Sequence, residues 1–79
     1  MVLRDEIEKL LAATRRRREE AAAEAARAAE DLVRQAGGLT PVEEVDPDRV
    51  RAAANGYAAA IETLKMLDDF ARELRGLLM

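Results

Sequence analysis

The four consecutive arginines, Arg15–Arg18, are the side chains best suited to bind a charged ligand such as a phosphate. Successive helical residues are turned by about 100°, so four in a row spread around a helix instead of forming one basic face. No aromatic residue stands among them to stack on a base, and the net charge of the chain is −3. We therefore expect a solvated run that pairs with Glu19 and Glu20 one turn on and places Arg15 opposite Asp68. Nucleic-acid binding is not expected.

The carboxylates are the second set of groups that could do chemistry, as magnesium ligands or as general acids and bases. The chain has 16 Asp and Glu residues, so neighbours such as Glu43 and Glu44 arise by chance. It has no Glu-x-x-His pair and no matched Glu-x-x-Glu pairs, which are the spacings of helical di-metal sites. Because Cys, His and Ser are absent as well, zinc sites of Cys and His, Ser or Cys nucleophiles and imidazole bases are excluded. The sequence predicts no enzyme activity, no metal and no cofactor.

Two further features could serve a binding partner. Tyr57 falls on an apolar stripe, so we expect its ring in the core with the hydroxyl at the rim, and not a catalytic phenol. Met66 and Phe70 are one helical turn apart and fit either a core stripe or a groove for a partner helix. The sequence leaves these two alternatives open.

The elements that position these residues are predicted to be two long helices. Between residues 3 and 36 there is neither Gly nor Pro, and the strong helix formers Ala, Glu, Arg and Leu dominate. We expect helices over about 3–36 and 47–77, joined by a loop over 37–46. The predicted fold is a single all-α domain over residues 1–79, an antiparallel helical hairpin.

Turn signals mark the helix ends. Gly37 and Gly38 supply the left-handed position that ends the first helix. Asp46 and Pro47 form the N-cap and the first helical position of the second. Between them, residues 40–43 have the spacing of a capping box, with Pro41 at the first helical position, which predicts a single helical turn.

The dipeptide Asn55-Gly56 is a turn signal inside the second predicted helix. Alanine flanks it, and the apolar spacing continues in phase across it. We therefore expect an unbroken helix in which Gly56 permits close approach, at a cost of about 1 kcal/mol relative to Ala. A break at this point, giving three helices, is the alternative.

Apolar residues recur at three- and four-residue spacing on both predicted helices, which indicates one apolar stripe on each. Folding the chain back on itself brings Ile7 and Leu11 to Leu74 and Ala71, and small residues in mid-helix face large ones. Val50 and Ala54 belong to the stripe of the second helix. The residues expected to form the association interface are Ile7, Leu11, Ala25, Ala29, Ile61, Leu64, Leu67, Phe70, Leu74 and Leu78.

The core of such a hairpin is thin. Hydrophobic residues make up 49% of the chain, but 17 of its 79 residues are alanine, and residues 12–31 include no larger apolar side chain. Burying a leucine-sized side chain contributes about 1.5–3 kcal/mol, whereas ordering each residue costs about 1–2 kcal/mol, so an isolated hairpin is expected to be marginal. From Leu64 to Leu78, apolar residues cover an arc wider than one neighbouring helix can bury.

The sequence therefore predicts a non-catalytic protein–protein interaction module. In the first alternative the chain forms a homodimer, in which two hairpins complete a four-helix bundle. In the second it is a small adaptor or co-chaperone that docks its leucine-rich end on helices of a larger partner. A designed helical bundle ranks lower, because 11 Arg against 2 Lys is more typical of a GC-rich genome.

In architecture the predicted hairpin is similar to the small hairpin co-chaperones of type III secretion needles and to secreted hairpin proteins with a Trp-x-Gly turn. The likeness covers the hairpin length and the proline that opens the second helix. The chain has no Trp-x-Gly, so it is assigned to neither family.

No apolar run approaches the about 20 residues that a membrane span needs. No leader with a charged start and an apolar centre opens the chain. We expect a cytoplasmic location and no membrane contact.

Overall fold

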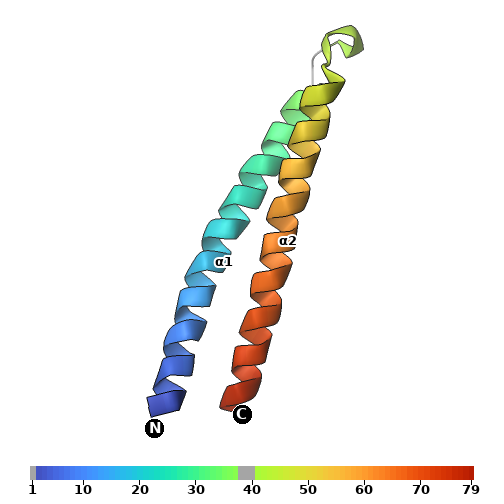
Figure 1. Cartoon of the computed structure of the whole chain (residues 1–79). Coiled ribbons are helices and arrows are strands. Elements are labelled where there is room, and N and C mark those ends of the chain that lie inside the picture. Colours follow the sequence, from blue (N-terminus) through green and yellow to red (C-terminus); the bar gives the residue numbers. More distant parts are fainter. Residues whose placement is uncertain (1, 38–40) are drawn as a thin grey trace.

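The computed structural model of the chain describes residues 2–37 and 41–79. Two long helices, α1 (Val2–Gln35) and α2 (Pro47–Leu78), run antiparallel, and a short 3-10 helix, η1 (Val42–Glu44), lies in the connection. Both termini lie at one end of the molecule and η1 lies at the other (Figure 1). The predicted all-α class is confirmed over the described residues, and the helix bounds agree with the prediction to within one residue.

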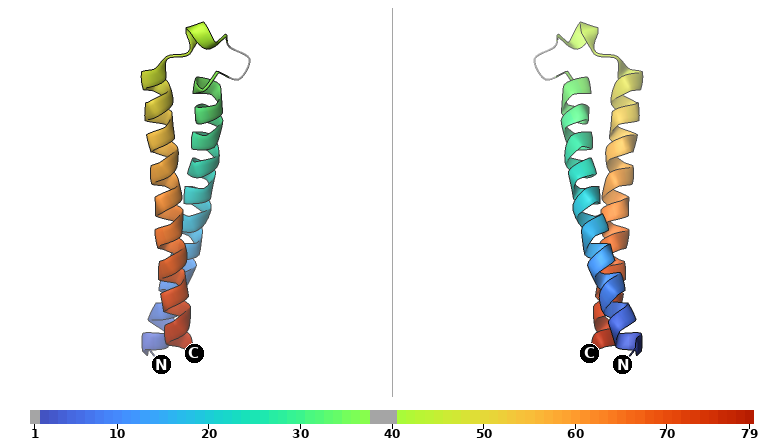
Figure 2. Two further views of the ribbon diagram at one scale, coloured as in Figure 1. Left: turned by 90° about the vertical axis from the view of Figure 1, so that its right-hand side faces the viewer. Right: turned by 90° about the vertical axis from the view of Figure 1, so that its left-hand side faces the viewer.

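The two helices form a rod with dimensions of 63 × 14 × 14 Å. In Figure 1 they overlap near the connection and separate toward the termini, whereas in the perpendicular views of Figure 2 the reverse holds. The helices therefore wind around each other along the rod. Winding of this kind keeps a seam of near-heptad spacing in contact over many turns.

The helix ends follow the predicted turn chemistry. Gly37 has a φ of 119°, a left-handed conformation that glycine adopts without strain. Asp46 caps α2, since its Oδ1 accepts a hydrogen bond from the Asp48 backbone N–H at 2.9 Å, and Pro47 follows as the first helical residue. The single turn in the connection forms as η1, but Pro41 is its N-cap and not its first residue, and no side chain caps it. Gly38 and Thr40, which were also expected to shape the connection, lie outside the described residues.

α2 continues unbroken through Asn55-Gly56, which confirms the preferred prediction. The close approach expected at Gly56 is wrong, because a methyl group added there would meet no atom within 4 Å. Ala53, one turn earlier, is buried instead, while the predicted stripe residue Ala54 is only half-buried. The seam therefore passes beside Gly56, which is exposed.

Two glycine substitutions are expected to change stability in opposite directions. Gly56→Ala should stabilise the fold by about 0.5–1 kcal/mol, since alanine favours the helix and its methyl group meets open space. Gly37→Ala should destabilise it by about 1–3 kcal/mol, because alanine is strained at that φ. Thermal melts of both variants and the parent chain at one concentration provide the measurement. A destabilised Gly56→Ala would show that this position does face the seam.

Candidate interaction surface

The seam between the helices has its largest side chains near the termini. Ile7, Leu11, Ala71 and Leu74 form one buried cluster, and Leu78 packs against it partly buried. This grouping is the pairing predicted from the apolar stripes. Thr14 continues the seam, and its hydroxyl donates to the Leu10 carbonyl oxygen at 2.7 Å, so the buried polar group is satisfied.

Farther along the rod the seam is made of alanine. Ala21, Ala25 and Ala53 are buried there, and no large side chain of the described residues is fully buried. Small residues let the two backbones approach, but each one removes little apolar area from water. The middle of the hairpin is therefore held by close contact over a small area.

The residues predicted to form the association interface are distributed unevenly around this seam. Ile7, Leu11, Ala25 and Leu74 are buried within the hairpin itself. Phe70 is exposed. The remaining five are half-buried at the borders of the seam, namely Ala29, Ile61, Leu64, Leu67 and Leu78. Tyr57 is half-buried too.

One ion pair joins the two helices within the described residues. Arg18 Nε donates to Asp68 Oδ1 at 2.5 Å, and Arg18 Nη2 lies 3.5 Å from Asp68 Oδ2. The ion pair therefore joins Asp68 to Arg18 and not to Arg15, the residue that the predicted antiparallel register places opposite Asp68. Helical side chains lean toward the N-terminus of their own helix, so long side chains on antiparallel helices lean toward each other. An ion pair between long side chains therefore joins two residues that each lie closer to the C-terminus of their own helix than two short core side chains that meet at the same level of the rod.

The remaining arginines of the run also differ from expectation. Neither Arg15–Glu19 nor Arg16–Glu20 forms an ion pair among the described residues. Most pairs within a helix have the acid three residues before the base, an order that the helix dipole favours. They are Asp31–Arg34, Asp46–Arg49, Asp48–Arg51 and Asp69–Arg72, at 3.0–3.8 Å. Arg15, Arg16 and Arg17 are exposed.

Arg18 stabilises the ionised form of its partner. Its hydrogen bond to Asp68, together with its charge, holds the pKa of that carboxyl below the ordinary value. The same bond raises the pKa of Arg18. Because both side chains are more than 40% exposed, water screens the pair, and its contribution to stability is small.

Five large apolar side chains on one side of the hairpin remain between 43% and 71% exposed. We call them the apolar face: Leu3, Leu10, Met66, Phe70 and Leu77. Leu10, Met66 and Phe70 line a groove of about 420 Å³ between the helices. Leu3 and Leu77 line a second groove, of about 180 Å³, beside the termini. Leu3 and Leu10, like Phe70 and Leu77, are seven residues apart, so the two grooves lie on the same side of the rod.

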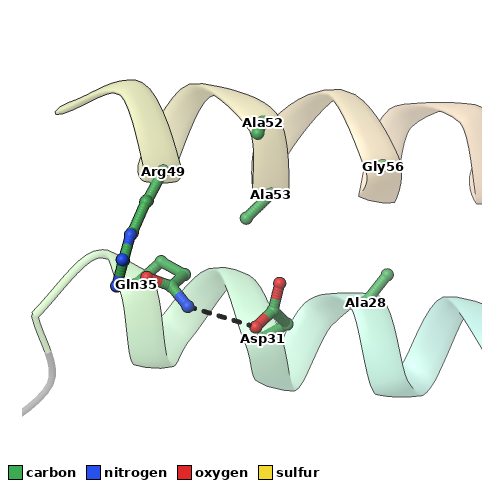
Figure 3. Close-up of a pocket in the computed structure, with 7 residues that line it drawn as sticks. All are labelled: Ala28, Asp31, Gln35, Arg49, Ala52, Ala53 and Gly56. Atoms are coloured by element: carbon green, nitrogen blue, oxygen red, sulfur yellow. Dashed lines mark hydrogen bonds between the residues drawn. The ribbon is translucent and has the colours of Figure 1, made fainter. Parts of the chain in front are cut away.

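Toward the connection, this side of the hairpin carries small and polar residues. A groove of about 320 Å³ is lined by Ala28, Ala52, Ala53 and Gly56, together with Asp31, Gln35 and Arg49 (Figure 3). Gln35 Nε2 donates to Asp31 Oδ1 at 3.5 Å. Asp31 follows Leu10 by three seven-residue steps, and Gly56 precedes Phe70 by two, so this groove continues the line of the apolar face.

The described part of the chain offers neither a metal-binding cluster nor a membrane-spanning helix. No group of three or more carboxylates there is placed to hold a metal ion. Within residues 2–37 and 41–79, neither helix has a stretch both long and apolar enough to cross a membrane.

The seam predicts which alanines can be replaced by a larger side chain and which large side chains cannot be truncated. Ala25→Leu should destabilise the hairpin by about 1–3 kcal/mol, because Ala25 is buried in the seam and a larger side chain there would overpack it. Ala23→Leu should be nearly neutral, since Ala23 is exposed. Ile7→Ala and Leu74→Ala should each cost about 2–5 kcal/mol. Thermal melts of these four variants at one concentration test the seam, and equal damage from the two alanine-to-leucine changes would contradict it.

The Arg18–Asp68 pair predicts a pH dependence. A carboxyl whose pKa is lowered in the folded state stabilises the fold above its unfolded pKa of about 3.9, and the contribution is lost as pH falls through the folded pKa. Asp68→Asn should therefore be less stable than the parent chain at pH 7 and equally stable well below the lowered pKa. Glu62→Gln is the control, because Glu62 is exposed and forms no ion pair with the described residues. A constant difference between Asp68→Asn and the parent chain across this pH range would show that the pair does not shift the titration of Asp68.

The chain matches no protein-family model, and no curated protein or solved structure shows significant similarity to it. The surfaces of the hairpin alone therefore support the functional proposal.

Proposed function

We propose that the chain is a non-catalytic association module, a helical hairpin that pairs with a second copy to complete a four-helix bundle. The observation that carries this proposal is the apolar face, on which five large side chains are exposed along one side of the rod. Contiguous exposed apolar patches of this kind are typical of interaction sites. The face also extends into a groove between the two helices, where a helix of a partner has room to pack.

The total surface of the hairpin supports the same proposal. The chain exposes 6260 Å². A compact monomer of its mass, 8.7 kDa, is expected to expose about 4,700 Å². The excess of about 1,500 Å² exceeds the surface that a standard specific interface takes from each partner, about 800 Å². A second helical layer would remove part of this excess.

The composition of the seam supports association for an energetic reason. Among the described residues, the large side chains that are buried in the seam lie near the termini, and farther along the buried residues are alanines with larger side chains only half-buried beside them. Small chains rarely bury enough apolar area to offset the conformational entropy that their residues lose on folding. Covering the apolar face would add the burial that the seam lacks.

A second candidate function is an adaptor that docks on helices of a larger protein. The groove beside the termini favours it, because Leu3, Ile7, Leu77 and Leu78 concentrate apolar surface at one end of the rod. An adaptor would use that end alone, whereas a bundle of two hairpins would use the whole apolar face.

Self-association predicts a dimer whose melting temperature rises with concentration, because folding is linked to association by mass action. Met66→Glu should weaken or abolish the dimer, since it places a charge on the apolar face, where Met66 is exposed. Val33→Glu is the matched control, because Val33 is equally exposed on α1 but lines none of the grooves. Sedimentation equilibrium and thermal melts over a range of concentrations provide the readouts. A monomer with a sharp, concentration-independent melt would exclude self-association.

A further inference from the structure

We propose that the second copy binds the apolar face with its connection at the same end of the bundle, so that α1 of each copy packs against α2 of the other. The inference rests on the proposed self-association and adds to it the surface and the direction of the partner. A two-fold axis parallel to the rod generates this arrangement, in which every neighbouring pair of helices is antiparallel.

The first argument is the change in polarity along this side of the hairpin. The apolar face occupies the end with the termini, whereas Asp31, Gln35 and Arg49 border the groove near the connection. With both connections at one end, apolar surface covers apolar surface, and the polar groups face one another. A copy turned end over end along the full rod would instead place Leu3 and Leu77 against Asp31 and Arg49. Such contacts would bury charged groups against apolar side chains, which is costly.

The second argument is the charge on the two outer edges of the apolar face. On α2, Met66, Asp69 and Glu73 form a helical row, and all three line one groove with Phe70. Asp69 pairs with Arg72, whereas Glu73 forms no ion pair with the described residues. This row therefore holds two carboxylates, and that of Glu73 is without an ion pair among the described residues.

The corresponding row on α1 contains cations. Lys9, Ala13 and Arg16 succeed one another at helical spacing, and Ala13 lines the groove with Leu10. Glu6 precedes this row, and Glu20 follows it one turn beyond the apolar face. Neither Lys9 nor Arg16 forms an ion pair within the described residues.

Only one direction of the second copy makes these edges complementary. With connections at the same end, the α1 row lies along the α2 row of the partner, and Lys9 lies at the level of Glu73. An end-over-end copy sets α2 against α2, so that acidic edge meets acidic edge. Complementary charge selects among orientations that bury similar apolar area.

The distance between the connections of the two copies tests the direction in which the second copy binds. The chain has no cysteine, so Val42→Cys introduces a single thiol for a spin label, at a well exposed position in η1. Pulsed electron paramagnetic resonance of the labelled dimer should give a separation on the order of 20–30 Å, which is the width of two packed helical layers plus the label tethers. A copy turned end over end would separate the labels by about the 63 Å length of the rod or more.

Exchanging the charges of Lys9 and Glu73 tests whether the α1 row of one copy lies along the α2 row of the other. Lys9→Glu should raise the dimer dissociation constant about two- to fivefold, and adding Glu73→Lys to the same chain should restore it. Lys65→Glu is the control, because Lys65 is also an exposed lysine without an ion pair among the described residues, but it lies on α2 and outside the row of Lys9, Ala13 and Arg16. A double variant that fails to recover, or a Lys65→Glu variant that is equally weakened, would overturn the pairing of α1 with α2 of the partner.

The outcomes separate this inference from the function on which it rests. A dimer with distant labels would overturn the direction and leave the association module standing. A chain that stays monomeric at every concentration would overturn both. A dimer with close labels and a rescued charge exchange would support both.

Discussion

Two straight helices can bury side chains against each other along one seam, and this limit shapes the rest of the molecule. The seam of this hairpin accepts one narrow stripe from each helix, and it is filled by Ile7, Leu11 and Leu74 near the termini. Winding of the helices extends the contact over the length of the rod but does not widen it. Every apolar side chain outside the stripe therefore stays in water unless another molecule covers it. The apolar face is the direct consequence.

Alanines and large apolar residues are buried at different places along the rod. Ala21, Ala25 and Ala53 are the buried residues in the stretch where the larger side chains are only half-buried. At the end with the termini, α2 carries apolar residues on more than one side, and Met66 and Leu77 are left exposed although Leu74 is buried. Residues of the same chemistry thus have two roles, which depend on their angle around the helix. The sequence left the role of Met66 and Phe70 open because both roles produce the same helical spacing.

Local signals predicted the fold well, because capping and helix propensity act within a few residues. Asp46 with Pro47, and the left-handed Gly37, determine where the helices end. The predictions that depended on the angle between the helices were less accurate. Arg18 replaced Arg15 as the partner of Asp68, and Gly56 lies beside the seam. Periodicity locates a stripe to within about one turn, whereas the lean of long side chains and the winding of the helices determine which residue of that turn is in contact.

For the candidate surface, the sequence predicted that the apolar arc of α2 is too wide for one neighbour but did not predict which side stays open. That side is defined jointly by α1 and α2, since Leu10 lies on one helix and Phe70 on the other. The same juxtaposition gives the surface a direction, because the residues that follow Leu10 and precede Phe70 by steps of seven are polar or small. An apolar surface alone would accept a partner in either orientation. In the proposed dimer, the polar groove near the connection and the acidic row of α2 would remove that symmetry, so the same surface that proposes a second copy also proposes its direction.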